Sequence, residues 1–318
     1  MSKPYIVSMS PHMHSDTTIQ RIMMDVIIAL LPATIFGIYH FGARALLITV
    51  LSILSCVITE AVFQIATGRK ILIQDLSAVV TGLLLALNLP HTVPVFIPIL
   101  GGAFAIVIVK QVFGGLGQNF MNPALGARAF LLISFAGIMT NWQVDGVSSA
   151  TPLTIIKETD VLNISAMISD GTLPGMVTAF LGSIAGSIGE TSVLALLIGG
   201  IYLIVKKVIS WRIPVMFIGT VAVMSFVLQG FDVQLMGYQL ITGGLVLGAF
   251  FMATDYSSSP NSAIGQIIMG IGCGLLTIII RLYGGYPEGV SFAILIMNLF
   301  VPLIDRYTIP KAFGEVQV

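Results

Sequence analysis

Ten long apolar stretches run through the chain, and they restrict the folds that it can adopt more than any other feature. A helix needs roughly 20 mostly apolar residues to cross a bilayer, and shorter segments suffice where a helix is broken or buried. Backbone groups in hydrocarbon must pair internally, so we expect each stretch to be helical. The sixth is expected to be irregular or broken, and the third and eighth are short. The stretches lie at residues 22–41, 44–66, 76–89, 95–113, 123–140, 176–205, 213–229, 238–253, 265–283 and 290–304.

The composition supports a lipid environment. Of 318 residues, 56% are hydrophobic and 9% are charged, which is too apolar for a water-exposed surface. The formal net charge is zero, so nothing favours nucleic-acid binding. Cys56 and Cys273 both lie in apolar stretches, so we expect neither a CxxC metal site nor a disulfide. The polar segment 1–21 lacks a short apolar core with a cleavage site, and we interpret it as an arm of the mature protein.

The basic residues indicate how the helices are oriented. If residues 1–21 are cytoplasmic, ten lysines and arginines fall at inner helix ends or loops, and Arg44, Lys157 and Arg281 fall outside. Positive charges concentrate on the cytoplasmic side of membrane proteins. We therefore expect the 1–21 arm and the 306–318 tail to be cytoplasmic, and the longest loop to lie outside at 141–175. The ten inner residues are Lys3, Arg21, Arg69, Lys70, Lys110, Lys206, Lys207, Arg212, Arg306 and Lys311.

Two similar segments predict an internal repeat. Residues 81–90 and 242–251 both open with Thr-Gly and an apolar run, and a full span ending in an aromatic residue and two glycines follows each. Five spans separate corresponding elements, so repeats at 22–140 and 176–305 would insert with opposite orientations. Similar composition of Thr-Gly-rich helices is the alternative explanation. The predicted fold is an all-α polytopic membrane protein of about ten helices, in two inverted five-helix repeats with broken short helices.

The 141–175 loop contains the most informative motif. Residues 145–153 read Asp-Gly-Val-Ser-Ser-Ala-Thr-Pro-Leu. They resemble the signal Asp-x-x-Ser-Gly-Ala-Thr, on which a flavin transferase esterifies the threonine hydroxyl with the phosphate of FMN. The acceptor here would be Thr151, on an accessible loop. The small residues Ser148, Ser149 and Ala150 leave room for the nucleotide and free backbone donors for its phosphate. Ser149 replaces the commoner glycine, which matters if a positive φ is needed there.

Four further segments carry a resemblance that covers nearly the whole chain. They are residues 114–124 (GGLGQNFMNPA), 186–192 (GSIGETS), 252–255 (MATD) and 281–289 (RLYGGYPEG). In this order they resemble the RnfD subunits of Rnf electron-transport complexes, and the related NqrB subunits of the sodium-pumping NADH:quinone reductases. The compact length and short amino-terminal arm are more similar to RnfD.

The resemblance implies a subunit of a redox-driven ion translocase in a bacterial or archaeal cytoplasmic membrane. Its expected cofactors are FMN, bound through a phosphoester at Thr151, and a noncovalent riboflavin nearer the cytoplasmic side. Ferredoxin and NAD would react on partner subunits that carry iron–sulfur clusters and flavin, and Na⁺ or H⁺ would be exported. No complete active site is expected on this chain, and no GxGxxG segment follows a strand.

Polar residues inside apolar stretches are costly and are therefore candidates for function. Arg128 could neutralise the flavin phosphate or reduced ring, reach the membrane surface, or pair with a carboxylate. Glu190 lies among glycines near the outer face, and we favour a flavin-site role for it over a helix cap. Asp255 most simply ends the eighth helix. The remaining candidates are Asp25, Glu60, Asn88, Asn119, Asn122, Arg281 and Glu288.

Two other functions remain possible at this point. A flavin-free inverted-repeat permease would account for the repeat and the broken helices, but it has no need of the flavin acceptor motif. An NqrB-like subunit would carry the same flavin and deliver electrons to quinone. The four histidines have no pairing that suggests a metal site.

Overall fold

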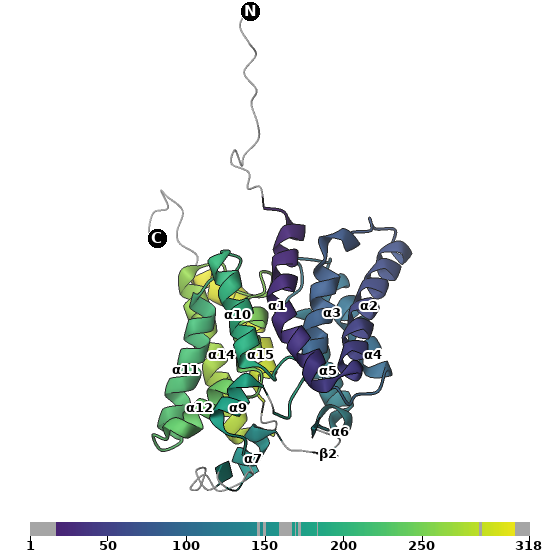
Figure 1. Cartoon of the computed structure of the whole chain (residues 1–318). Coiled ribbons are helices and arrows are strands. Elements are labelled where there is room, and N and C mark those ends of the chain that lie inside the picture. Colours follow the sequence, from purple (N-terminus) through teal and green to yellow (C-terminus); the bar gives the residue numbers. More distant parts are fainter. Residues whose placement is uncertain are drawn as a thin grey trace, which may run out of the picture.

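The fold is a helical bundle whose two halves lie side by side (Figure 1). The computed structural model describes residues 17–144, 147–148, 151–158, 167–168, 170, 173–182, 184–285 and 288–308. Within them the strands are one short antiparallel pair, β1 (Gln143–Val144) and β2 (Val147–Ser148), in which Gln143 lies opposite Ser148. Everything else regular is helical.

The amino-terminal half contributes the elements from α1 to α6. Thr18 caps the first helix, and Asn122 caps α5 with Pro123 at its first position. The helix α4 continues directly as the π-helical turn η2, a deviation that often marks functional regions. The bounds are α1 (Ile19–Phe41), α2 (Ala43–Ala66), η1 (Ile73–Asp75), α3 (Ser77–Leu87), α4 (Phe96–Phe104), η2 (Ala105–Gln111), α5 (Pro123–Ser134) and α6 (Ala136–Met139).

The carboxy-terminal half follows the β1–β2 pair. Its helices are α7 (Pro152–Glu158), α9 (Met176–Leu181), α10 (Val193–Val205), α11 (Arg212–Leu228), α12 (Val233–Ile241), α13 (Leu245–Leu247), the π-helical η4 (Gly248–Met252), α14 (Ala263–Tyr283) and α15 (Val290–Thr308). The two halves meet where α1 packs against α10 and α5 packs against α15.

Several helices are long and apolar enough to cross a membrane. In the described part of the chain these are α1, α2, α14 and α15, and the bent pair α12 with α13–η4 is a fifth if it counts as one span. Large apolar side chains such as Ile65, Ile133 and Val223 are exposed on the outside of the bundle, as expected of a protein solvated by lipid. The chain is thus a multi-pass membrane protein.

Two of the expected spans are interrupted. The stretch 176–205 divides into α9 and α10, as its irregular pattern predicted. The stretch 238–253 is one of the short segments that were expected to be broken, and it is interrupted too. Its chain bends by 58° between α12 and α13–η4 because Gly243 and Gly244 both adopt positive φ angles, 69° and 67°. Only glycine takes that conformation without strain.

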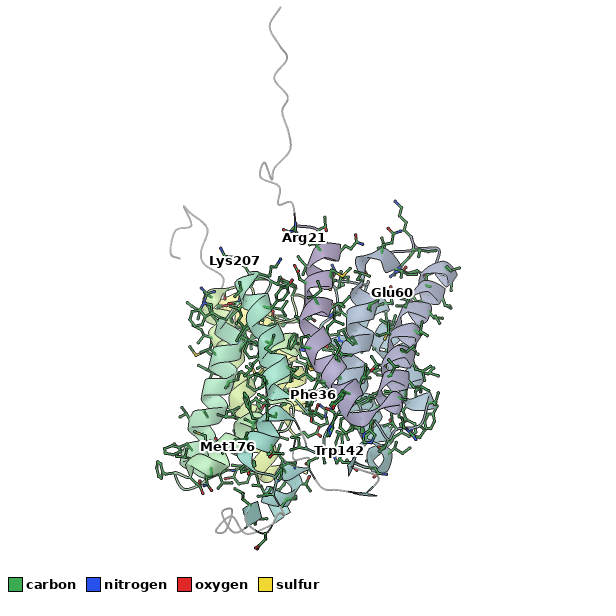
Figure 2. The ribbon with its side chains drawn as sticks, in the orientation of Figure 1. Arg21, Phe36, Glu60, Trp142, Met176 and Lys207 are labelled. Atoms are coloured by element: carbon green, nitrogen blue, oxygen red, sulfur yellow. The ribbon has the colours of Figure 1, made fainter. Side chains whose placement is uncertain are left out.

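The first and last described residues of the chain lie at the same end of the bundle. Figure 2 places Arg21 and Lys207 at one end of the bundle and Trp142 and Met176 at the other. The first turn of α1 and the last turn of α15 share the end that carries Arg21 (Figure 1). Lys110 was counted among the basic residues at inner helix ends or loops. It is buried in η2 and forms an ion pair within the bundle.

The contact between α1 and α10 depends on Gly199. A Cβ built there would lie 1.9 Å from the carbonyl oxygen of Ala29 in α1, and backbone cannot yield locally. We therefore expect Gly199→Ala to lower the free energy of unfolding by about 3 kcal/mol, at the upper end of overpacking costs. Gly219→Ala in α11 is the matched control, because nothing lies within 4 Å of its Cβ and alanine favours a helix. Thermal unfolding in detergent measures both, and equal melting temperatures would contradict the prediction.

Candidate functional site

Thr151 lies immediately before α7, and its side chain is only 7% exposed. Its Oγ1 is 2.8 Å from Oγ1 of Thr154 and accepts the backbone N–H of Thr154 at 3.3 Å. The hydroxyl therefore caps α7. This differs from the accessible hydroxyl that we expected from the sequence. An enzyme can reach Thr151 only before α7 packs or while it is detached.

Thr151 lines a narrow cleft. The cleft lies between α7, the turn that precedes α10, and the break between α12 and α13. Two carboxylates, Glu190 and Glu288, lie in its wall. Small residues make up much of the remainder. The lining residues are Thr151, Pro152, Leu153, Ile184, Ala185, Gly186, Glu190, Thr242, Gly243 and Glu288.

The structure describes only part of the rest of the flavin acceptor motif. Asp145, Ser149 and Ala150 lie outside the described residues. The backbone of Ser148 belongs to β2 and pairs with that of Gln143. The assignment of these four residues to a cofactor site stays a prediction.

Arg128 joins three parts of the bundle. It lies in the middle of α5 and is buried, and one guanidinium nitrogen donates to Oδ1 of Asn88 at 3.1 Å and to Oγ of Ser291 at 2.7 Å. The other pairs with Glu288 and lies 3.6 Å from Oε1 of Glu190. Pairing with a carboxylate was one of the three roles that we considered for Arg128. Its charge is thus shared between two carboxylates beside the cleft.

Glu190 is placed by the turn that precedes α10 and is only 5% exposed. Among the described residues, its Oε1 has no hydrogen-bond donor. A Cβ at Gly244 would lie 2.4 Å from this oxygen, so the glycine at the α12–α13 break makes the close approach possible. The structure therefore brings Arg128, Glu190 and Thr151 of the predicted site to one place.

Arg281 is a second buried cation at this place, and sequence reasoning did not assign it to the site. Its guanidinium donates to the carbonyl oxygens of Thr242 at 3.0 Å and Gly243 at 3.2 Å, and to Oε1 of Gln239 at 2.9 Å. It also donates to the carbonyl of Glu288 at 3.1 Å. These bonds satisfy the carbonyls that the helix break leaves unpaired. The available signal was the RLYGGYPEG segment, which carries Arg281 and Glu288 around a tight turn.

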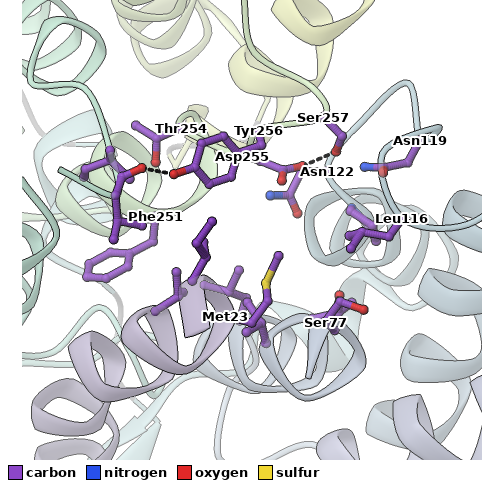
Figure 3. Close-up of a pocket in the computed structure, with 18 of the residues that line it drawn as sticks. Met23, Ser77, Leu116, Asn119, Asn122, Phe251, Thr254, Asp255, Tyr256 and Ser257 are labelled. Atoms are coloured by element: carbon purple, nitrogen blue, oxygen red, sulfur yellow. Dashed lines mark hydrogen bonds between the residues drawn. The ribbon is translucent and has the colours of Figure 1, made fainter. Parts of the chain in front are cut away.

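A larger cleft opens near the end of the bundle where α1 begins. Figure 3 shows Asn119, Asn122 and Asp255 on one side of it, with Met23 and Ser77 opposite. Asp255 follows η4 and accepts hydrogen bonds from the hydroxyls of Ser257 at 3.1 Å and Ser258 at 3.0 Å. The broken helix ends before it, at Met252 with Ala253 as its C-cap. Mostly apolar walls with a few convergent polar groups are typical of ligand pockets.

A buried ion pair lies beside this second cleft. Nζ of Lys110 is 2.7 Å from Oε1 of Glu60, and both side chains are 2% exposed. Ser77 and Gln111 complete the cluster, at 2.6 Å from Nζ and 2.7 Å from Oε1 respectively. Across the described residues, no three His, Cys, Asp or Glu side chains gather as metal ligands would.

Known proteins resemble the chain over nearly its full length. The NQR2, RnfD, RnfE family matches residues 6–314. The D component of the Na⁺-translocating ferredoxin:NAD⁺ oxidoreductase complex of Acetobacterium woodii is 50% identical, over 98% of this chain and 96% of the relative. The D component of the proton-translocating ferredoxin:NAD⁺ oxidoreductase complex of Clostridium ljungdahlii is 43% identical over the same shares.

A third relative extends the comparison to a different group of bacteria. The D component of the ion-translocating oxidoreductase complex of Stutzerimonas stutzeri is 40% identical, over 94% of this chain and 93% of the relative. All three relatives are named as subunits of redox enzyme complexes that move ions. Since both the family match and these identities extend across the chain, it belongs to the NQR2, RnfD, RnfE family.

Proposed function

We propose that the chain is the RnfD subunit of an Rnf complex, an ion-translocating ferredoxin:NAD oxidoreductase, and that it carries FMN on Thr151. It relays electrons between partner subunits that hold iron–sulfur clusters and flavin, and this transfer is coupled to export of Na⁺ or H⁺. One observation carries the proposal. The acceptor threonine of the DxxSSAT motif faces a cleft lined by Glu190 and Glu288, and the buried cations Arg128 and Arg281 interact with these two carboxylates.

The topology that goes with this function is about ten spans in two inverted repeats, with both termini cytoplasmic and the 141–175 loop outside. The order of elements supports it, because the third span of each half is short or bent, α3 in the first half and the pair α12 with α13–η4 in the second. The contacts of α1 with α10 and of α5 with α15 join corresponding helices. The short helices α3 and η4 meet end to end, where Nδ2 of Asn88 lies 3.7 Å from Sδ of Met252.

The residues around Thr151 fit a phosphate-linked flavin. Ala185, Gly186 and Gly243 put small residues along the wall of the cleft beside Thr151. The two arginines beside it offset the charges of Glu190 and Glu288, and the carbonyl oxygens bound to Arg281 fix that side chain in place. FMN supplies one- and two-electron redox chemistry when bound. The chain holds it, limits access of water to it and surrounds it with fixed charges.

The second cleft is the place where a noncovalent riboflavin fits. Riboflavin is uncharged and needs apolar walls with hydrogen-bonding amides, which Asn119 and Asn122 offer. We expect Asn119→Leu to release at least half of the acid-extractable flavin. Gln118→Leu, at the exposed neighbouring position, should retain it. Chromatography of the flavin extracted by acid from purified chain measures both, and equal release from the two variants would remove riboflavin from this cleft.

The complex isolated from its native host tests the function. A mass spectrum of the peptide that contains Thr151 should show an added FMN, and subunits with iron–sulfur clusters should copurify. Vesicles should couple ferredoxin-driven NAD reduction to uptake of labelled Na⁺ or of protons. An unmodified Thr151 would favour the permease. Reduction of quinone by NADH in place of this activity would favour the NqrB-like alternative.

A further inference from the structure

The cleft beside Thr151 contains a buried carboxylate oxygen with an open lone pair. Within the described part of the chain, no donor reaches Oε1 of Glu190, and the nearest charged atom is the Arg128 nitrogen at 3.6 Å. An unpaired carboxylate oxygen is costly away from water. Natural sites rarely keep such an oxygen unless it has a ligand or a proton to bind.

The charges around Glu190 balance before any cofactor is attached. Arg128 on α5 and Arg281 on α14 face it as cations, and Glu288, which precedes α15, faces it as a second carboxylate. Lys157 of α7 is exposed and donates to the carbonyl of Gly284, outside the cleft. Two positive and two negative charges sum to zero. A phosphodiester on Thr151 adds one negative charge that this group does not offset.

An uncompensated charge in a low-dielectric cleft attracts a cation strongly. Neither arginine can offset this added charge. Each carries a single positive charge, and both already donate hydrogen bonds to oxygen atoms. Glu288 is paired with Arg128. The acceptor that remains open is Oε1 of Glu190, on the same wall as Thr151.

We propose that Glu190 is a proton-binding residue of the flavin site, and that it becomes protonated when Thr151 bears the phosphate. This inference rests on the proposed attachment of FMN to Thr151. The carboxylate takes a proton from hydronium to give a carboxylic acid and water, and no electron is exchanged. The new O–H then has a phosphate oxygen to which it can donate. Charge neutrality of the cleft is restored by the proton that it binds.

Infrared spectroscopy of the purified full chain at neutral pH tests this directly. Chain labelled with ¹³C at the glutamate carboxyl separates the acid C=O band from flavin carbonyls, and H₂O/D₂O exchange identifies the protonated form. Wild type coexpressed with the flavin transferase should show one such glutamate band. The same chain expressed without the transferase should show a weaker band. Glu190→Gln with the transferase should also lack it, while Glu288→Gln reports whether the band belongs to the other carboxylate.

The results separate this inference from the proposed function. Absence of flavin fluorescence on wild type in a denaturing gel would refute the attachment site itself. Flavin on Thr151 without a protonated glutamate, or a band that survives in Glu190→Gln, would overturn the inference alone. An equal band in the unmodified chain would do the same. A band that appears only when Na⁺ is replaced by choline would replace the proton with a sodium ion at the same oxygen.

Discussion

Chain that carries Thr151→Ala is expected to show no covalent flavin when it is coexpressed with a flavin transferase. The phosphoester needs a side-chain oxygen as nucleophile, and alanine offers none. Thr151→Ser should retain flavin, since the hydroxyl remains and only a methyl group is lost. Ultraviolet fluorescence of the polypeptide in a denaturing gel measures the attached flavin, and the alanine variant should fall to the background of unmodified protein.

Thr154→Ala is the matched control for this experiment. Its hydroxyl lies 2.8 Å from that of Thr151, so both variants disturb the same cap of α7. Only Thr151→Ala removes the acceptor, and Thr154→Ala should stay fluorescent. Because Thr151 is buried in the folded chain, the Thr154 variant should also accept flavin at least as fast as wild type. Fluorescence that persists in Thr151→Ala would move the attachment site to another residue.

The local sequence pattern predicted helices well where a helix consists of one uninterrupted apolar stretch. The stretch 95–113 corresponds to α4 with η2, and 265–283 corresponds to α14 almost to the residue. Such helices satisfy their backbone internally, so their positions depend little on the rest of the chain. The interruption within 176–205 was also visible, because glycines and polar residues cluster before α10.

The position of the break at Thr242–Gly244 could not be predicted from the local sequence in this way. Its carbonyls are paired by Arg281 from α14, a contact between residues about 40 positions apart. Glycine-rich apolar sequence is compatible with a straight helix in a membrane, and only this long-range partner favours the bend. The candidate site could likewise be predicted only in part from the sequence. The motif identified Thr151, but the approach of Arg128 to Glu190 and Glu288 depends on how the two halves pack.

Lys110 illustrates how a charge at a helix end can be misread. It was counted among the charges at inner helix ends of the stretch 95–113, and it is buried and paired with Glu60, 50 residues earlier. Both residues lie in apolar surroundings beneath the larger cleft. Pairing of this kind leaves no periodic pattern in the sequence, because its two members belong to different helices.

Loss of one partner of this ion pair is expected to have the largest effect on stability. Glu60→Ala leaves the ammonium of Lys110 in the bundle with Ser77 as its remaining partner, and Lys110→Ala leaves the carboxylate with the amides of Gln111 and Gln64. Breaking a buried pair in this way costs about 3–5 kcal/mol. Each single variant should therefore unfold at much lower temperature or denaturant concentration than wild type in detergent.

The double variant Glu60→Leu/Lys110→Met distinguishes the two possible sources of that loss. The attraction between the charges is offset by the cost of removing both from solvent, so replacing the pair with apolar side chains of similar volume should be nearly neutral, within about 1 kcal/mol of wild type. The strong recovery relative to either single variant is the expected result. If the double variant is as unstable as the single ones, the hydrogen bonds of Ser77 and Gln111 to the pair must hold α2, α3 and η2 together, and the charges themselves would not explain the stability.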